Sequence, residues 1–295
     1  MSKRNQFVRI LFWSVFVLSF ILFSCASKKP IWGDPQTGFI LQYRIAPEQM
    51  MNYKMSIGAV TSMDIMGQTM ETTSNVNLNY SMKGTGIDNQ KNLLAQIGIE
   101  ALDIVISSMQ GKTTLRTSPL VGKSFGLTLS PTGNEIEFIG IESIPKINFG
   151  EMEGGERSVQ PYFSDILPDL SNNPIKVGNT WTGQKEYHEP MGSLDLTIKV
   201  ESTNILEDFV TIGDLECARI RTESKGTVSG AGSQEEMYMM FNGDLESTSI
   251  WYFAFKEGVF VRMEAEQNLD ANIDIGDMGS IPMVTKDSIE IELIR

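Results

Sequence analysis

Leu194-Asp-Leu-Thr-Ile-Lys-Val-Glu201 alternates strictly between apolar and polar side chains. The same period of two runs through Val76-Asn-Leu-Asn-Tyr-Ser-Met82. Successive side chains of a strand point to opposite faces of a sheet, so each stretch predicts a strand with one apolar and one polar face. Such strands are typical of antiparallel sheets with one face in water. Long helical periodicity is nearly absent, and the predicted fold class is therefore mostly β.

Two hairpins are legible in the same pattern. Alternation over 125–129 leads into the turn 131–134 and resumes at Ile136, and alternation over 251–255 leads into Lys256-Glu-Gly258 and resumes at Val259. Glycine in such short loops supplies the positive φ that tight turns require. Each hairpin closes one half of the chain, and the two halves resemble each other in the order of their strands.

The exported part is predicted to consist of two related antiparallel β units, built as curved sheets or half-barrels. The N-terminal unit spans 38–147 and the C-terminal unit spans 174–295, with a linker over 148–173. A short helix is expected around 159–170 in that linker, limited by Pro161 and Pro168. The sequence leaves open whether the two units are separate domains or share one core.

The N-terminus has the layout of a secretory signal. A basic head with Lys3, Arg4 and Arg9 precedes the run 10–23, which is apolar except for two serines and too short to span a bilayer comfortably. Leu22-Phe-Ser-Cys25 resembles the lipobox of bacterial lipoproteins. The resemblance implies removal of residues 1–24, a thioether-linked diacylglycerol on Cys25, and fatty acylation, such as palmitoylation, of the new amino group. The alternative is an uncleaved membrane anchor.

Several chains of lipid on one residue anchor a protein stably, whereas a single chain does not. Residues 25–37 then form a tether to the membrane. In the same lipoprotein class an acidic residue after the cysteine favours retention in the inner membrane. Ala26-Ser-Lys-Lys29 follows here. A location in the cell envelope is expected, with the outer membrane favoured and the periplasmic or surface side left open.

Three further blocks carry a family resemblance: Leu120-Val-Gly-Lys-Ser-Phe125, Thr128-Leu-Ser-Pro-Thr-Gly133 and Pro174-Ile-Lys-Val-Gly-Asn-Thr-Trp181. They resemble recurring blocks in a family of exported bacterial β-rich proteins without an assigned biochemical role. The resemblance implies a β fold and an exported location. These are turn and strand motifs, and no catalytic residue is implied by them.

Charge and residue inventory exclude several classes of function. The chain has 24 basic and 37 acidic residues, a net charge of −13, and the leader holds basic but no acidic residues. Nucleic acid is therefore not expected as a partner. His188 and Cys217 lack companions for a zinc site or a catalytic triad, so no cofactor and no metal are expected. Cys217 is expected in the core and His188 in a solvated loop. Gly122-Lys-Ser124 lacks the first glycine of a phosphate loop.

Two clusters of side chains remain open to interpretation. Asp270, Asp274 and Asp277 do not have the spacing of a calcium loop and are interpreted as an acidic edge. Methionines gather at three places, which suits core packing, an adaptable apolar surface or, least of all, copper binding. The three groups are Met50, Met51 and Met55; Met63, Met66 and Met70; and Met237, Met239 and Met240.

The hypothesis favoured by the sequence is a non-catalytic, lipid-anchored β protein that binds an apolar ligand or lipid between curved sheets. Its alternatives are a structural or protein-interaction lipoprotein of the envelope, and a hydrolase with a pair of facing carboxylates. The expected partners are the membrane, through the lipid on Cys25, and an apolar ligand or an envelope protein. The candidate ligand-lining residues are aromatic side chains of the predicted strands: Tyr80, Phe125, Phe138, Trp251, Phe253 and Phe255.

Overall fold

The computed structural model describes residues 31–150, 155–191, 194–234, 237–276 and 279–294, and strands make up most of them. The predicted leader and Cys25 lie outside the described residues. The long strands are β3 (Met50–Ile65), β4 (Gln68–Ile87), β5 (Leu93–Ser108), β11 (Thr180–Met191), β12 (Leu194–Ile212), β13 (Leu215–Gln234), β14 (Met237–Ala254), β15 (Val259–Ile275) and β16 (Gly279–Ile294). The short ones are β1 (Gly33–Asp34), β2 (Gly38–Phe39), β6 (Gly111–Thr114), β7 (Ser124–Leu129), β8 (Glu135–Ile139), β9 (Ile147–Asn148) and β10 (Glu156–Arg157).

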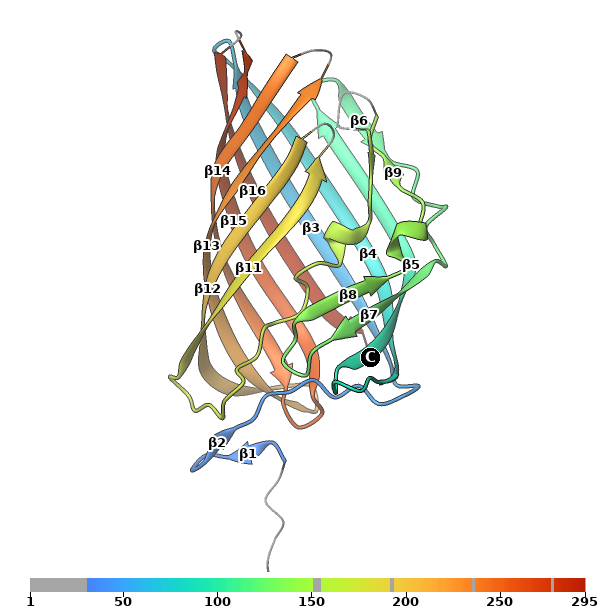
Figure 1. Cartoon of the computed structure of the whole chain (residues 1–295), viewed down its shortest axis with the longest axis vertical. Coiled ribbons are helices and arrows are strands. Elements are labelled where there is room, and N and C mark those ends of the chain that lie inside the picture. The colour runs from blue at the N-terminus through green and yellow to red at the C-terminus, as the bar shows by residue number, and fades with distance from the viewer. Residues whose placement is uncertain (1–30, 151–154, 192–193, 235–236, 277–278, 295) are drawn as a thin grey trace, which may run out of the picture.

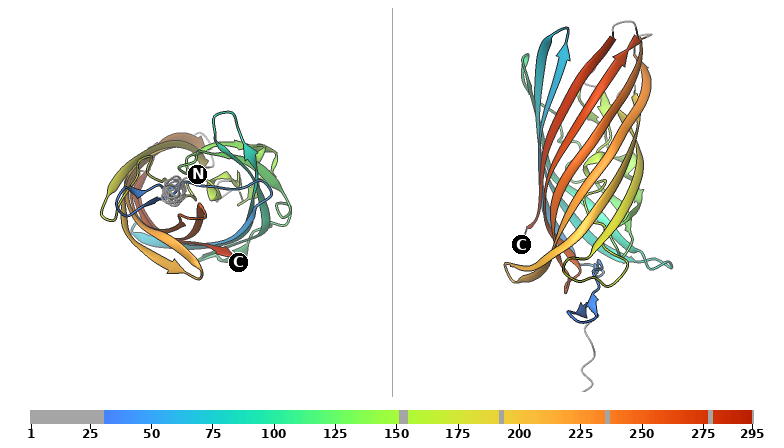
Figure 2. Two further views of the ribbon diagram at one scale, coloured as in Figure 1. Left: turned by 90° about the horizontal axis from the view of Figure 1, so that it is seen from below. Right: turned by 90° about the vertical axis from the view of Figure 1, so that its left-hand side faces the viewer.

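One antiparallel sheet of 12 strands dominates the molecule, in the order β11-β12-β13-β14-β15-β16-β3-β4-β5-β7-β8, with β6 on β5. The sheet curls strongly about its long axis, and its edge strands β11 and β8 are not paired with each other (Figures 1 and 2). The predicted mostly-β fold with curved antiparallel sheets is confirmed. Because β16 pairs with β3 from Met283–Met63 to Ile294–Asn52, both predicted units belong to one continuous sheet.

The period-two stretches and both hairpins lie where the alternation places them. Val76–Met82 lies within β4 and Leu194–Glu201 begins β12. β7 pairs with β8, and β14 pairs with β15. Gly133 and Gly258 in the two turns have φ of 100° and 74°, a region in which glycine is at ease.

The segment between β8 and β11 crosses the front of the curved sheet, between its two edge strands (Figure 1). The helix expected around 159–170 is reduced to the 3₁₀ turn Gln160–Tyr162. Pro161 suits the first turn of a helix, but Pro168 cannot donate the hydrogen bond that would continue one. No helix in the described ranges is long and apolar enough to cross a membrane.

A large apolar cluster, here called the proximal core, fills the end of the sheet that lies nearest β1 and β2. It contains inward side chains from both predicted units, such as Leu78 and Trp251. The connecting segments add to it: Leu41 and Tyr43 come from the loop before β3, and Phe163 comes from the segment between β8 and β11. The two units therefore share one core.

A second, separate cluster, here called the distal zone, lies on the inner face at the other end of the strands. Its described members all come from strands of the large sheet, and none comes from a connecting segment. The buried members are Leu194, Leu196, Ile198, Val228, Phe241, Ala271 and Met283, and Met63, Tyr187, Val200, Met239, Leu269 and Ile273 pack half-buried against them.

The outer face of the same strands is polar. Along β12 the exposed positions are Asp195, Lys199 and Glu201, and along β15 they include Glu264, Glu266, Asn268 and Asp270. Each alternates with a less exposed inward residue. The sheet therefore has its outer face in water and its apolar side chains inside.

Candidate functional site

A row of small polar side chains crosses the inner face between the two apolar clusters. Strand registers place these residues directly beside one another on neighbouring strands, because Ser202 pairs with Ser224, Ser224 with Ser247, and the row continues across β15, β16, β3 and β4. This row is here called the polar belt, and it consists of Ser202, Ser224, Ser247, Gln267, Asp287, Ala59 and Ser74. It separates the distal zone from the proximal core.

The charged residue of the belt is Asp287 on β16. Gln267 Nε2 donates a hydrogen bond of 3.2 Å to its Oδ2 across the β15–β16 pair. Burial raises the pKa of Asp287, and this hydrogen bond lowers it by a smaller amount. One step toward the distal end, the hydroxyls of Thr61 and Thr285 lie 3.1 Å apart. The belt is thus polar and sheltered, and a carboxyl in it carries a cost when it is ionised.

Glycines hold β12 and β13 close together in the distal zone. A Cβ at Gly226 would lie 2.4 Å from the carbonyl oxygen of Lys199, and one at Gly230 would lie 2.3 Å from that of Asp195. No larger residue fits there without moving the neighbouring backbone. These positions support the tight curl of the sheet around its inner face.

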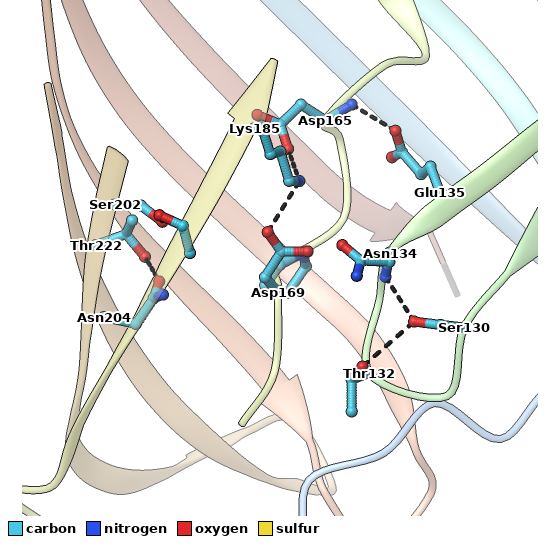
Figure 3. Close-up of polar contacts among 12 residues, drawn as sticks. Ser130, Thr132, Asn134, Glu135, Asp165, Asp169, Lys185, Ser202, Asn204 and Thr222 are labelled. Carbon is cyan, nitrogen blue, oxygen red and sulfur yellow. Dashed lines mark hydrogen bonds and ion pairs between the residues drawn. The ribbon is translucent and has the colours of Figure 1, made fainter. Parts of the chain in front are cut away.

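A charged cluster joins the two edge strands of the sheet (Figure 3). Glu135 is on β8, Lys185 is on β11, and Asp165 and Asp169 are on the segment between them. Lys185 Nζ forms ion pairs with Asp165 and, at 3.0 Å, with Asp169. Glu135 accepts backbone N–H groups from Asp165 at 2.7 Å and from Ile166 at 3.2 Å. We call these four charged residues the seam.

Burial shifts the ionisation of the seam. It raises the pKa of Glu135 to about 8, although the backbone N–H groups and Lys185 lower it. Burial also raises the pKa of Asp169, while Lys185 lowers it. Burial alone would lower the pKa of Lys185, but the two aspartates outweigh this effect and the net direction is upward. Lys185 is therefore charged, and its charge holds the segment against β11.

The belt and the seam are continuous. Next to Ser202 on β11 stands Gly183, and a Cβ there would lie 2.8 Å from Ser202 Oγ and 3.6 Å from Asp169 Oδ2. Trp181 Nε1 donates to the backbone oxygen of Asp169 at 2.8 Å. Polar groups therefore extend from Ser74 on β4 to the opposite edge of the sheet.

The six predicted ligand-lining aromatics lie in or against the proximal core. Phe253 and Tyr80 are fully buried, Phe125, Phe255 and Trp251 are nearly so, and Phe138 packs half-buried against them. Their rings pack on other rings: Phe253 on Tyr43 with centroids 5.0 Å apart, Phe255 on Phe39 at 5.3 Å, and Tyr80 and Phe125 on Phe163 at 5.6 and 4.9 Å. These contacts make the six side chains part of the packing of the proximal core.

The other residues considered for a functional role have, where the structure describes them, surroundings that do not form a site. Cys217 is buried, and burial raises the pKa of its thiol to about 11, so the core position expected for it is confirmed. His188 is exposed, but it lies on β11 rather than in a loop, with Nδ1 3.1 Å from Thr197 Oγ1. Asp270 is exposed on β15, and Asp277 lies outside the described residues. Among the side chains that the structure describes, no group of three His, Cys, Asp or Glu could hold a metal ion.

The methionine groups are divided between the proximal and distal ends of the sheet. Met51 and Met55 belong to the proximal core. Met63 and Met70 are paired on β3 and β4, and Met63 also faces Met283 on β16, so this group lies at the distal zone. Met66 at the β3–β4 turn is 95% exposed, and Met240 is 41% exposed. The distal end is therefore lined inside and capped outside with flexible apolar side chains.

Two open hollows on the outer face have volumes of about 520 and 620 Å³. Outward polar side chains contribute to both of them: Glu201 and Lys225 line both hollows, and Glu223 and Glu246 line the first. Lys225 and Glu246 already form an ion pair of 2.9 Å.

Periodicity did not single out the polar belt. Ser202, Ser224 and Ser247 occupy inward positions that are apolar elsewhere on their strands, so each serine interrupts the apolar pattern. The strand register places the three serines side by side, and only this register shows that they form one polar row. The seam gave no such signal, because its acids are common residue types in an acidic chain.

No family model matches the chain, and no curated protein is similar to it in sequence. An outer membrane channel from Pseudomonas putida F1 aligns over 85% of this chain and 97% of its own, with 9% identity and a TM-score of 0.26. OccK11 from Pseudomonas aeruginosa aligns over 88% and 100%, with 8% identity and a TM-score of 0.21. A DUF1329 family protein from Desulfovibrio piger aligns over 81% and 85%, with 11% identity and a TM-score of 0.15. Likeness at these values says nothing about what this chain binds.

Proposed function

We propose that this is a non-catalytic, lipid-anchored protein of the cell envelope that binds an apolar ligand, of the size of a lipid chain, on the distal inner face of its sheet. The observation that carries the proposal is the distal zone itself. It gathers apolar side chains from β11 to β16 and β3 on a concave face, and in the described ranges no apolar side chain of a connecting segment packs against them. An apolar lining with a few polar groups beside it is typical of a binding site. The buried members of the zone are at most 9% exposed because they pack on one another, and they would repack around the ligand.

The place of the ligand differs from the place that the aromatic residues suggested. Phe253 and its neighbours stabilise the proximal core, where residues of 141–149 and 159–175 already pack against the sheet. Among the described residues, the distal zone is mainly aliphatic, with Phe241 and Tyr187 as its aromatic members, and it contains three methionines, which adapt to ligands of different shape. We therefore assign binding to the distal zone and structural packing to the proximal core.

The anchor supports the proposal from the other end of the molecule. The chain enters the described structure next to β1 and β2, beyond the proximal end of the sheet (Figure 1). A lipid on Cys25 would hold that end at the membrane and leave the distal zone pointing away from it. Cys25→Ser is expected to move the protein from the membrane fraction to the soluble fraction. Retention of this variant in the membrane at precursor size would point to an uncleaved anchor instead.

Photolabelling of the mature protein, purified from its membrane, tests the binding proposal. A diazirine-bearing hexadecyl probe is expected to label peptides of β12 and β15 at the distal zone, identified by mass spectrometry. Leu269→Glu places a charge on the inner face and is expected to reduce labelling about tenfold, because a buried charge costs more than 1.4 kcal/mol. Val284→Glu, on the outer face of β16, is the matched control.

Circular dichroism of both variants establishes that each is folded before labelling is compared. Equal labelling of Leu269→Glu and Val284→Glu, or labelling confined to the outer face, would overturn the assignment. Native mass spectrometry of the same preparation is expected to show a co-purifying amphiphile that is lost in Leu269→Glu.

A further inference from the structure

The polar belt fixes which amphiphiles suit the distal zone, and this inference rests on the proposed function. Asp287 is the next inward residue of β16 after Thr285, and it lies where the apolar lining of the distal zone ends. Among the described residues, Gln267 is the donor to this carboxylate, which therefore keeps acceptor capacity on the inner face. Neighbouring belt positions on β3 and β14 are Ala59 and Ser247, which are too small to reach across it.

The inward charges around the belt are mostly negative. Among the described inward positions of β11 to β16, β3 and β4, the acids are Asp287 and Glu189 and the basic residue is Lys185, while Arg157 of β10 lies close enough to Glu189 to lower the pKa of its carboxyl. Lys185 is already engaged by Asp165 and Asp169. An anionic head group placed at the belt would therefore meet an unneutralised carboxyl in a sheltered place, where charges interact more strongly than in water.

We infer that the ligand is an amphiphile whose polar end carries N–H or O–H donors and no negative charge. Its apolar chain lies on the distal zone, and its polar end reaches the belt and donates to Asp287 and to the serine hydroxyls. A hydrogen bond to a carboxylate is stronger than one between neutral groups, and an amine gains the charge attraction as well. Carboxylate and phosphate amphiphiles are discriminated against at the same position.

Competition for the hexadecyl photoprobe tests this inference on the mature protein. Dodecylamine and dodecanoate have apolar chains of similar length and opposite charge. Dodecylamine is expected to displace the probe at a concentration about tenfold lower than dodecanoate, which corresponds to about 1.4 kcal/mol. Asp287→Asn is expected to reduce this ratio to about threefold or less, because the amide removes the charge but keeps the shape.

The negatively charged surface of the protein attracts cationic amphiphiles even without a specific binding site. A matched variant separates this general attraction from binding at Asp287. Asp270→Asn removes the same charge from the exposed outer face of β15 and is expected to keep the tenfold ratio. A ratio that falls equally in both variants, or dodecanoate competing as well as dodecylamine in the unmodified protein, would overturn the inference and leave the proposed function standing. Failure of the photoprobe to label the distal zone would instead overturn the proposed function.

Discussion

The proximal core and the distal zone are built from the same strands, yet they differ in what covers them. In the proximal core, the sheet packs against Leu41, Tyr43 and Phe163, which come from loops outside the sheet. In the distal zone, the described apolar residues pack only on side chains of the sheet itself. At one end the sheet is therefore packed against loops, whereas at the other end the described apolar side chains pack on one another.

The comparison shows that strands with alternating apolar side chains on their inner face do not by themselves form a packed core. A strand buries its apolar side chains on one face wherever it runs, but stability comes from close packing with a second layer. The long strands of this protein extend past that second layer. Between the two regions the belt places serine at inward positions of β12, β13, β14 and β4, and Gln267 and Asp287 on β15 and β16.

The largest expected effect comes from comparing a phenylalanine of the proximal core with a leucine of the distal zone. Phe253 is fully buried against Tyr43, so Phe253→Ala is expected to lower the free energy of unfolding by about 3–5 kcal/mol. Leu269 is only half-buried, and Leu269→Ala is expected to cost about 1 kcal/mol while reducing labelling by the photoprobe. Urea denaturation measures both. Similar losses of stability would mean that the distal zone is also a closed core.

Removing the lysine of the seam is expected to have an intermediate effect. Lys185→Met leaves Asp165 and Asp169 beside Glu135 without their cation, and the segment that covers the proximal core loosens. Since these groups are partly exposed, we expect a loss of about 1–2 kcal/mol. Limited proteolysis is expected to cut the segment between β8 and β11 faster.

Lys225→Met is the control for the seam, because the exposed pair of Lys225 with Glu246 lies on the outer face. No measurable loss of stability is expected from it. If the two lysine variants behaved alike, the seam would be an ordinary surface ion pair and not the clasp of the covering segment.

The smallest expected effect is a change in pH dependence. The pKa of Glu135 is about 8 in the folded protein, above the value near 4.3 of an unfolded chain, so the folded state binds more protons between these values. Stability is therefore expected to fall as pH rises from about 4.3 to about 8. Glu135→Gln carries no titrating group, and its melting temperature is expected to fall less over this range.

Glu137→Gln provides the comparison, because Glu137 is exposed on the same short strand. Its melting temperature is expected to follow that of the unmodified protein across the range. Parallel curves for the Glu135 and Glu137 variants would contradict the role assigned to burial at the seam.

Much of the local structure could be predicted from the sequence. Alternation placed the strands around Leu78 and Leu196, and the glycines at 133 and 258 marked the two hairpin turns. The helix expected around 159–170 is a single 3₁₀ turn, because Pro168 and the packing of Phe163 into the core outweigh its weak helical signal. The ligand-lining assignment drew on aromatic size, which equally suits a packed core.

The sequence by itself determined that this protein is a sheet with one wet face, because side-chain direction follows directly from the period of two. It also carries the lipobox-like Leu22-Phe-Ser-Cys25 on which the anchor is proposed. Only the tertiary structure decided which apolar residues are covered and which are not. The pairing of β16 with β3 and the alignment of Ser202, Ser224, Ser247 and Asp287 depend on register and curl, which are set by contacts between residues far apart in the chain.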